Sequence, residues 1–123
     1  MLTYAPQPSL EEADKQYRMY VLIRRDILPL VHCGVQGAHA AIEFMHYHPN
    51  DNTARWVVDH KTLIFLEASE KQIQDKMKWF ADRHMNFQPF REPDMDNTLT
   101  AVCFQPIQYG LGKEVFKGFK LLK

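Results

Sequence analysis

Two short apolar runs limit what this chain can fold into. Residues 18–24 and 62–66 each hold apolar side chains at consecutive positions, a pattern typical of strands covered on both faces. Each run is followed by a segment with helical spacing, at about residues 35–46 and 69–83. Two strands joined by a helix are expected to run parallel, so the pattern predicts an α/β fold.

The two helical segments carry different signals. Ser69 and Gln72 have the spacing of a capping box, in which each side chain bonds the backbone amide of the other residue. The buried stripe predicted for this second helix is Ile73, Met77, Phe80 and Ala81. The first helix is predicted to begin near residue 35, after a loop. Its predicted buried stripe is Val35, Ala38, Ile42 and Met45.

The rest of the chain completes a small sheet. Residues 87–91 and 99–104 read as two further strands, the first at an edge because of Pro89. Residues 53–60 predict a short helical turn, and residues 113–123 a tail that packs as a helix or strand. The predicted order is β-α-β-α-β-β plus a tail. The expected fold is an α/β three-layer sandwich, a mixed four-stranded sheet flanked by helices over residues 17–123, after a polar extension over residues 1–16.

Composition sets the class of protein and its compartment. The chain has 123 residues, which suits one domain, and no apolar run long enough for a membrane span. Fifteen basic and fifteen acidic residues give a formal net charge of zero, which argues against strong sequence-independent binding of nucleic acid. Two lone cysteines and an acidic start without an export signal predict a reduced, cytoplasmic protein. The histidines lack zinc-ligand spacing, so no metal or other cofactor is expected.

Two stretches carry a resemblance to a known family. Val21-Leu22-Ile23-Arg24-Arg25-Asp26, followed by Val35-Gln36-Gly37-Ala38-His39-Ala40-Ala41, resembles the signature of the type II peptidyl-tRNA hydrolases. That family has a strand ending in Arg-x-Asp, then a helix beginning Lys-x-Ala-Ala-Gln-x-x-His-Ala. Gln36 and His39-Ala40 fall at the matching spacing, and Thr100-Ala101-Val102 with Gln105-Pro106 resembles the closing strand. The resemblance covers about residues 17–123.

The resemblance implies an activity and a partner. It implies hydrolysis of the ester that joins a peptide or an aminoacyl group to tRNA, with charged tRNA as the partner and no cofactor. A homodimer stays open. Two other functions compete with this one: an inactive domain that binds tRNA or protein on the same fold, and a hydrolase of small acyl substrates.

Two positions depart from the family pattern. His32 occupies the place of the family's lysine, and the family's Asp-Ala-Gly-x-Thr loop is replaced by residues 91–98. Either Glu92 or Asp94 can stand in for the family's catalytic aspartate. We therefore predict that His32 and one of these two acids form the reactive pair, because a neutral imidazole accepts a proton near pH 7. The competing interpretation is that His32 is an ordinary loop histidine.

Six further residues are candidates for binding the substrate, and each has a plainer interpretation. They are Arg25, Asp26, Gln36, His39, Thr98 and Thr100. The first two end a strand, where ligands commonly bind, but they also suit an exposed ion pair. His39 equally suits a structural histidine, and the threonines suit plain strand positions. A lysine-rich tail after residue 112 fits tRNA phosphates or a solvated face.

Overall fold

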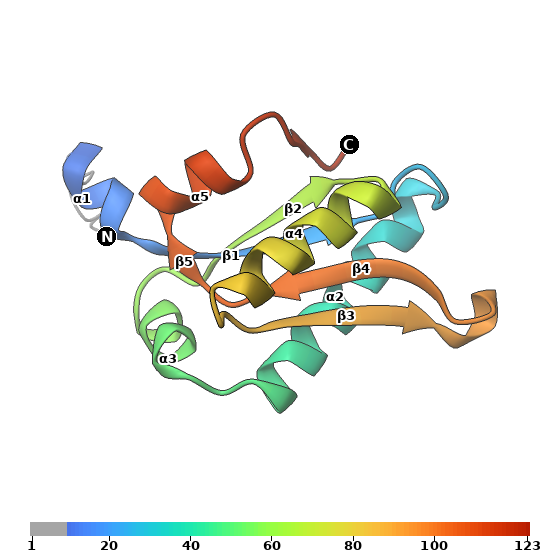
Figure 1. Cartoon of the computed structure of the whole chain (residues 1–123), viewed down its shortest axis with the longest axis horizontal. Helices are drawn as coiled ribbons and strands as arrows, with labels where there is room; N and C mark the ends of the chain where they lie inside the picture. The colour runs from blue at the N-terminus through green and yellow to red at the C-terminus, as the bar shows by residue number, and fades with distance from the viewer. Residues whose placement is uncertain (1–9) are drawn as a thin grey trace, which may run out of the picture.

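The structure, a computed structural model, describes residues 10–123 as a three-layer α/β sandwich (Figure 1). A mixed sheet with the strand order β3-β4-β1-β2-β6 forms the middle layer, and β5 pairs with β1. The strands are β1 (Tyr17–Ile23), β2 (Thr62–Glu67), β3 (Phe87–Glu92), β4 (Thr98–Phe104), β5 (Ile107–Gln108) and β6 (Lys120–Leu121). The helices are α1 (Leu10–Lys15), α2 (Leu30–Tyr47), α3 (Asp51–Val58), α4 (Glu70–Asp82) and α5 (Tyr109–Val115), with a 3-10 turn at Pro93–Met95.

The strand pairing confirms the predicted mixed sheet but not its size. β1 runs parallel to β2, and β3 runs antiparallel to β4 at the edge of the sheet, as the sequence predicts. The prediction of four strands is wrong, because the sheet has six. The two additional strands, β5 and β6, are two residues long. A segment this short carries no alternation of apolar and polar residues by which a strand could be recognised.

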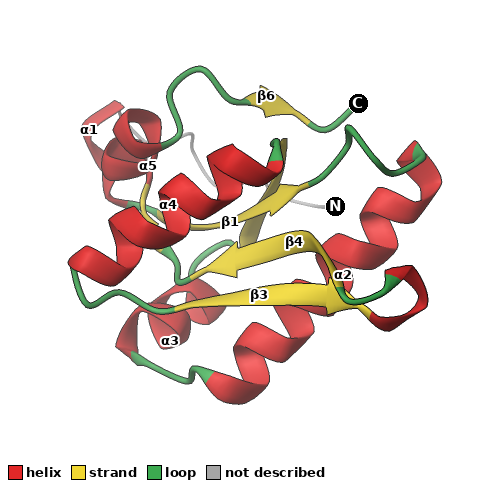
Figure 2. Cartoon of the chain, turned by 45° about the vertical axis from the view of Figure 1, so that its right-hand side comes forward, coloured by secondary structure: helices red, strands yellow, loops and turns green. Residues whose placement is uncertain are grey.

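Alternate residues of β1 face two separate cores. Met19, Val21 and Ile23 point toward α2 and α3, and pack with Ala40 and Phe44 of α2. Tyr20 and Leu22 point the other way, toward α4 and α5. Figure 2 shows these helices on opposite sides of the strands. The two cores therefore account for the consecutive apolar residues Met19–Ile23 of β1.

Aromatic rings fill the core under α4 and α5. Phe80 of α4 lies over Phe104 of β4 with ring centroids 4.3 Å apart, and Phe104 lies 5.7 Å from Phe116. α4 begins with the predicted capping box between Ser69 and Gln72. Its predicted stripe is buried at Ile73 and Phe80 and partly buried at Met77, whereas Ala81 is exposed.

Helix α2 differs from its prediction in where it begins. It starts at Leu30, directly after Pro29 at the N-cap, so His32 lies in the first helical turn and not in a loop. Pro29 fixes the extended backbone that precedes a helix, and Gly34 is accommodated inside the helix. The glycine and the proline together suggested a loop in the sequence.

The predicted buried stripe of α2 is also wrong. Val35, Ala38, Ile42 and Met45 are exposed. The buried face consists of Cys33, Gln36, Gly37, Ala40 and Phe44. The physical reason is close packing: a Cβ atom on Gly37 would lie 2.8 Å from both Ile23 and Phe65. Gly37 and Ala40 let the helix approach the sheet closely, and the aliphatic residues of the predicted stripe face outward.

The remaining segments form short elements. The turn predicted around residues 53–60 is helix α3, which Asn50 caps and whose Trp56 packs on the α2-side core. Of the predicted N-terminal extension, residues 1–9 lie outside the described residues, and α1 contacts α5 through an ion pair of 2.7 Å between Asp14 and Lys113. Among residues 10–123, no helix is both long and apolar enough to cross a bilayer.

Candidate functional site

Three polar side chains from separate elements meet where α2 passes the ends of β3 and β4. The Gln36 side-chain amide donates to Glu92 Oε2 at 2.7 Å, and its oxygen accepts from the Thr100 hydroxyl at 2.5 Å. Gln36 and Thr100 are buried, whereas Glu92 is partly exposed. A buried glutamine needs partners for both ends of its amide, and these two residues supply them. We call Gln36, Glu92 and Thr100 the polar triad.

A β-bulge turns the Thr100 side chain toward Gln36. Phe90 pairs with Ala101 and Arg91 with Leu99, so Thr100 is the extra residue between two regular pairs. An extra residue breaks the alternation of faces, which lets Thr100 point toward α2 although Ala101 beside it packs on the same core. The bulge therefore puts the Thr100 hydroxyl on the α2 side of the sheet, where regular pairing would have placed only Ala101.

The geometry distinguishes the two candidate acids. Glu92 joins the triad, and its other oxygen accepts the backbone amide of Asp94 at 3.2 Å. The hydrogen bond from Gln36 lowers the pKa of Glu92, helped by the Asp94 amide and the nearby His39, so Glu92 is ionised at neutral pH. The Asp94 carboxylate is exposed and has no hydrogen bond or ion pair within the described residues. Glu92 is the acid that the fold holds in place.

The two candidate histidines lie on the same side of α2 as Gln36. His39 stacks on Phe90 with ring centroids 4.7 Å apart and an interplanar angle of 9°. His32 is exposed one helical turn before Gln36, a spacing that puts both on one face. Within residues 10–123, no hydrogen bond or ion pair joins His32 to Glu92 or Asp94. The reactive pair with His32 thus stays a prediction.

The candidates at the end of β1 have a different partner from the expected one. Asp26 pairs with Arg24, not with Arg25, through two bonds of 2.9 and 3.1 Å. This hydrogen-bonded guanidinium lowers the pKa of Asp26. The Arg24 backbone amide donates to the Thr100 carbonyl at 2.8 Å, and Arg24 is only 7% exposed. Arg24 thus links the triad to Asp26, a role that the Arg-x-Asp spacing could have indicated.

Arg25 and Asp26 line a hollow at the carboxyl ends of β1 and β2. The hollow has a volume of about 370 Å³. Its polar lining comprises Arg25, Asp26, Glu67, Ser69, Gln72 and Lys120. Arg25 itself donates to the backbone oxygens of Leu28 and Lys123 at 2.7 and 3.0 Å. This end of a parallel strand pair is where α/β proteins commonly bind ligands.

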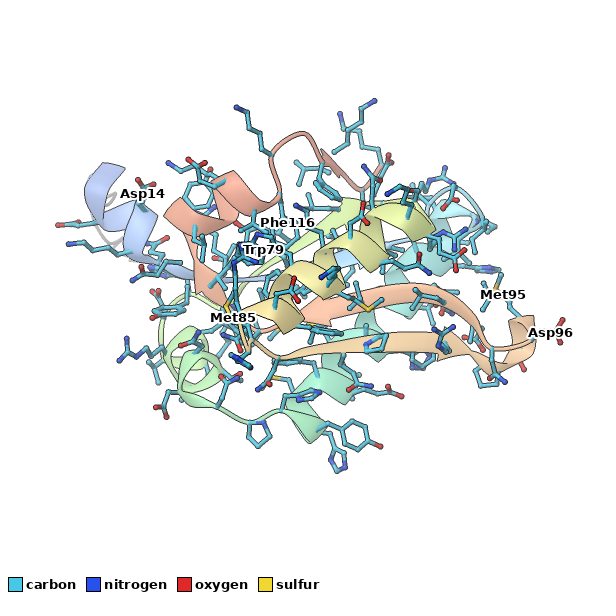
Figure 3. All side chains as sticks on the ribbon, viewed as in Figure 1. Asp14, Trp79, Met85, Met95, Asp96 and Phe116 are labelled. Carbon is cyan, nitrogen blue, oxygen red and sulfur yellow. The ribbon has the colours of Figure 1, made fainter. Side chains whose placement is uncertain are left out.

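Thr98 has a structural role in the β3–β4 hairpin. Its hydroxyl donates to the Met95 carbonyl at 2.5 Å and closes the 3-10 turn. Figure 3 shows Met95 and Asp96 at the tip of this hairpin, at the opposite end of the molecule from Asp14. Asp96 and Asn97 have φ angles of 54° and 60°, the left-handed backbone that a tight turn requires.

Other chemistries have little support in the described residues. Cys33 and Cys103 are buried, and the loss of solvent raises the pKa of both thiols, which disfavours the reactive thiolate. In residues 10–123, no three side chains of His, Cys, Asp or Glu come together as a metal site would require.

The fold and the triad define an α/β sandwich domain with a carboxylate–amide–hydroxyl cluster at one end of its sheet. No protein-family model matches the sequence, and no curated protein matches it. Among solved structures, the chain resembles Atu0240 from Agrobacterium tumefaciens, a protein of unknown function, with a TM-score of 0.60 and 11% identity. The match covers 86% of this chain and 97% of that one. At this identity the likeness shows a shared fold.

Proposed function

We propose that this chain is an ester hydrolase of the peptidyl-tRNA hydrolase type, with Glu92 at the centre of its site. The polar triad carries the proposal. Gln36 comes from α2, and Glu92 and Thr100 lie 56 and 64 residues later on the β3–β4 hairpin, yet two hydrogen bonds join these three residues, all of which are among the candidates that the family resemblance selects. Buried Gln36 and Thr100 satisfy each other by a hydrogen bond, and the Gln36 amide in turn holds the ionised carboxylate of Glu92.

The triad suits the orientation of a water molecule. Each oxygen of Glu92 already accepts one bond, from Gln36 or from the Asp94 amide, and keeps a second lone pair for water. The water oxygen attacks the carbonyl carbon of the ester, and the bond from that carbon to the ribose oxygen breaks. The water loses one proton and the ribose oxygen gains one, so the products are a peptide acid and free tRNA.

His32 is the group we propose as the proton acceptor. A carboxylate whose pKa is lowered holds water firmly but is a weak base, whereas a neutral imidazole accepts a proton near pH 7. His32 lies one helical turn from Gln36 and is exposed to solvent. The hollow lined by Arg25 and Asp26 is the proposed seat for part of the substrate.

The test is cleavage of an N-acetylaminoacyl-tRNA by purified protein. Replacing Glu92→Gln should lower kcat/KM by about 100-fold or more, because the placed carboxylate is lost. The matched control is Asp94→Asn, which neutralises an exposed acid two residues away and should change kcat/KM by less than about twofold. Equal rates for both variants would remove Glu92 from the mechanism. A wild-type protein that binds the tRNA but never cleaves it would favour the inactive binding domain.

The acid-rich hairpin tip favours a second candidate, a hydrolase of small acyl esters. Glu92, Asp94 and Asp96 lie within five residues, with Arg91 as the basic neighbour. Such a surface repels phosphates. The two candidates differ in their response to salt, since tRNA binding weakens steeply as salt rises and small neutral esters do not respond in this way. Salt-independent turnover of an N-acetylamino acid methyl ester, without turnover of the tRNA, would select the second candidate.

A further inference from the structure

The outer face of α2 carries an apolar stripe that no described element covers. Val31, Val35, Ala38, Ile42 and Met45 follow one another at intervals of four, three, four and three residues. This spacing keeps them on one line along the helix, as in the seam of a coiled coil. Val31 is 74% exposed and Ile42 is 68% exposed. We call these five residues the α2 stripe.

The exposed area matches the apolar part of a protein interface. Four large side chains of the α2 stripe are exposed: Val31, Val35, Ile42 and Met45. They expose on the order of 400 Å² together, about half of the roughly 800 Å² per partner that a standard interface buries. An apolar patch of a few hundred Å² on a protein surface is often a functional one.

The near absence of charged residues on α2 indicates what kind of partner could bind the stripe. In its 18 residues, the helix has Glu43 as its one acid and contains no lysine or arginine. A helix that lies on a membrane surface normally carries basic residues on its polar face, and a nucleic-acid surface requires them too. A charged protein partner would find nothing to pair with along the stripe. The surface therefore suits an equally uncharged, apolar helix.

We infer that the occupant is a second copy of this chain, with two α2 helices packed antiparallel across a twofold axis at Ala38. The stripe is nearly symmetric about that residue. Val35 and Ile42 lie three and four positions away on either side, and Val31 and Met45 lie seven positions away. In the antiparallel pair, Val35 meets Ile42 of the other copy, and Val31 meets Met45. Small Ala38 at the centre lets the two helices approach closely.

The borders of the stripe fit the same arrangement. His32, His39 and His46 follow one side at intervals of seven residues and form a polar rim. Gly34 and Ala41 follow the other side, and a Cβ on Gly34 would have open space around it. Because Gln36 lies beyond this polar rim and not in the stripe, the polar triad would lie beside the dimer interface and not within it. The dimer does not depend on the proposed hydrolase activity.

The association state of the full chain tests this inference. Sedimentation velocity over a concentration series up to about 100 µM should show a dimer. Ala38→Glu places two like charges at the twofold axis and should raise the dimer dissociation constant by about 100-fold or more. The matched control is Val58→Glu on α3, which puts the same charge on a side chain that is 84% exposed and should leave the dimer intact.

A cross-link tests the position of the axis. Ala38→Cys should form a disulfide-linked dimer under mild oxidation, and Val58→Cys should not, because only residue 38 meets its own copy. The native Cys33 and Cys103 are buried and should not react in the folded protein. A wild-type monomer at every concentration would overturn the inference. So would a monomer that binds phosphatidylcholine vesicles through the stripe, or a dimer that Ala38→Glu leaves unchanged.

Discussion

Helix α4 covers one face of the sheet and helix α2 covers the other (Figure 2). α4 buries Ile73 and Phe80 against the sheet. Its exposed face carries two ion pairs, Lys71 with Asp75 and Lys78 with Asp82. α2 buries Phe44 but also Gln36 and Gly37, and it turns an aliphatic stripe toward solvent. The first arrangement stabilises a fold. The second combines packing on the sheet with a buried polar triad and an exposed apolar face.

The largest expected difference between the two helices is in their contribution to stability. Replacing Phe80→Ala should lower the free energy of unfolding by about 3–5 kcal/mol, because a buried ring leaves a cavity among other aromatic rings. The matched change Ile42→Ala on α2 should cost less than about 0.5 kcal/mol in dilute, monomeric protein. Urea unfolding measures both. Similar losses would mean that the α2 stripe is buried in the monomer.

The second-largest expected difference is between the stability effects of replacing one glutamine on each helix. Gln36→Leu leaves the buried Thr100 hydroxyl with only the long 3.5 Å bond to the Phe90 carbonyl and should lower the free energy of unfolding by about 1–3 kcal/mol. Gln72→Leu on α4 removes only the exposed half of a capping box and should cost no more than about 1 kcal/mol. The same urea experiment compares the two variants. A larger loss for the α4 variant would contradict the structural role given to the triad.

Two glycines sharpen the contrast within α2 itself. Gly37→Ala should cost about 1–3 kcal/mol, because its Cβ would lie 2.8 Å from the side chains of Ile23 and Phe65. Gly34→Ala meets nothing within 4 Å and should stabilise the helix by up to about 1 kcal/mol. Thermal unfolding of dilute protein should therefore move in opposite directions for the two variants. A shift in the same direction would show that α2 does not press on the sheet as described.

The smallest effect is on the titration of Glu92. Its lowered pKa means that its contribution to stability is present above the pKa of an unfolded glutamate and is lost as pH falls through the folded value. Gln36→Leu removes the largest cause of the shift, so the pKa of Glu92 should rise toward the ordinary value. A side-chain carboxyl titration by NMR measures this. No movement in the variant would mean that Gln36 does not hold the carboxylate.

The buried face of α4 could largely be predicted from sequence, and that of α2 could not. β1, β2 and α4 were predictable because consecutive apolar residues and the capping box of Ser69 are local signals. For α2, the rule that apolar stripes face the core pointed to the wrong face, because Gly37 and Ala40 make the closer contact. Local periodicity cannot report how closely a helix approaches the sheet.

The candidate site was predictable in its members more than in its geometry. The family resemblance selected Gln36, either Glu92 or Asp94, and either Thr98 or Thr100, and the fold joins Gln36 to Glu92 and Thr100. It did not decide between Glu92 and Asp94, because that choice depends on how the hairpin turns. Arg24 was missed because a buried arginine at the end of an apolar strand looks like a boundary residue. Its partners Leu99 and Thr100 are distant in sequence, and its bond to Asp26 depends on how the chain turns after β1.

The extra residue in β4, Thr100, belongs to the polar triad but is not needed for the regular pairing of the strand. Leu99 packs on the α4 side and Ala101 on the α2 side, so without Thr100 the strand would alternate regularly from Leu99 to Phe104. Loss of a single codon would leave an unbroken ladder and an intact sandwich, but Gln36 would have no hydroxyl beside it. A lineage of such domains can therefore gain or lose this cluster by a one-residue insertion or deletion while its scaffold is inherited unchanged.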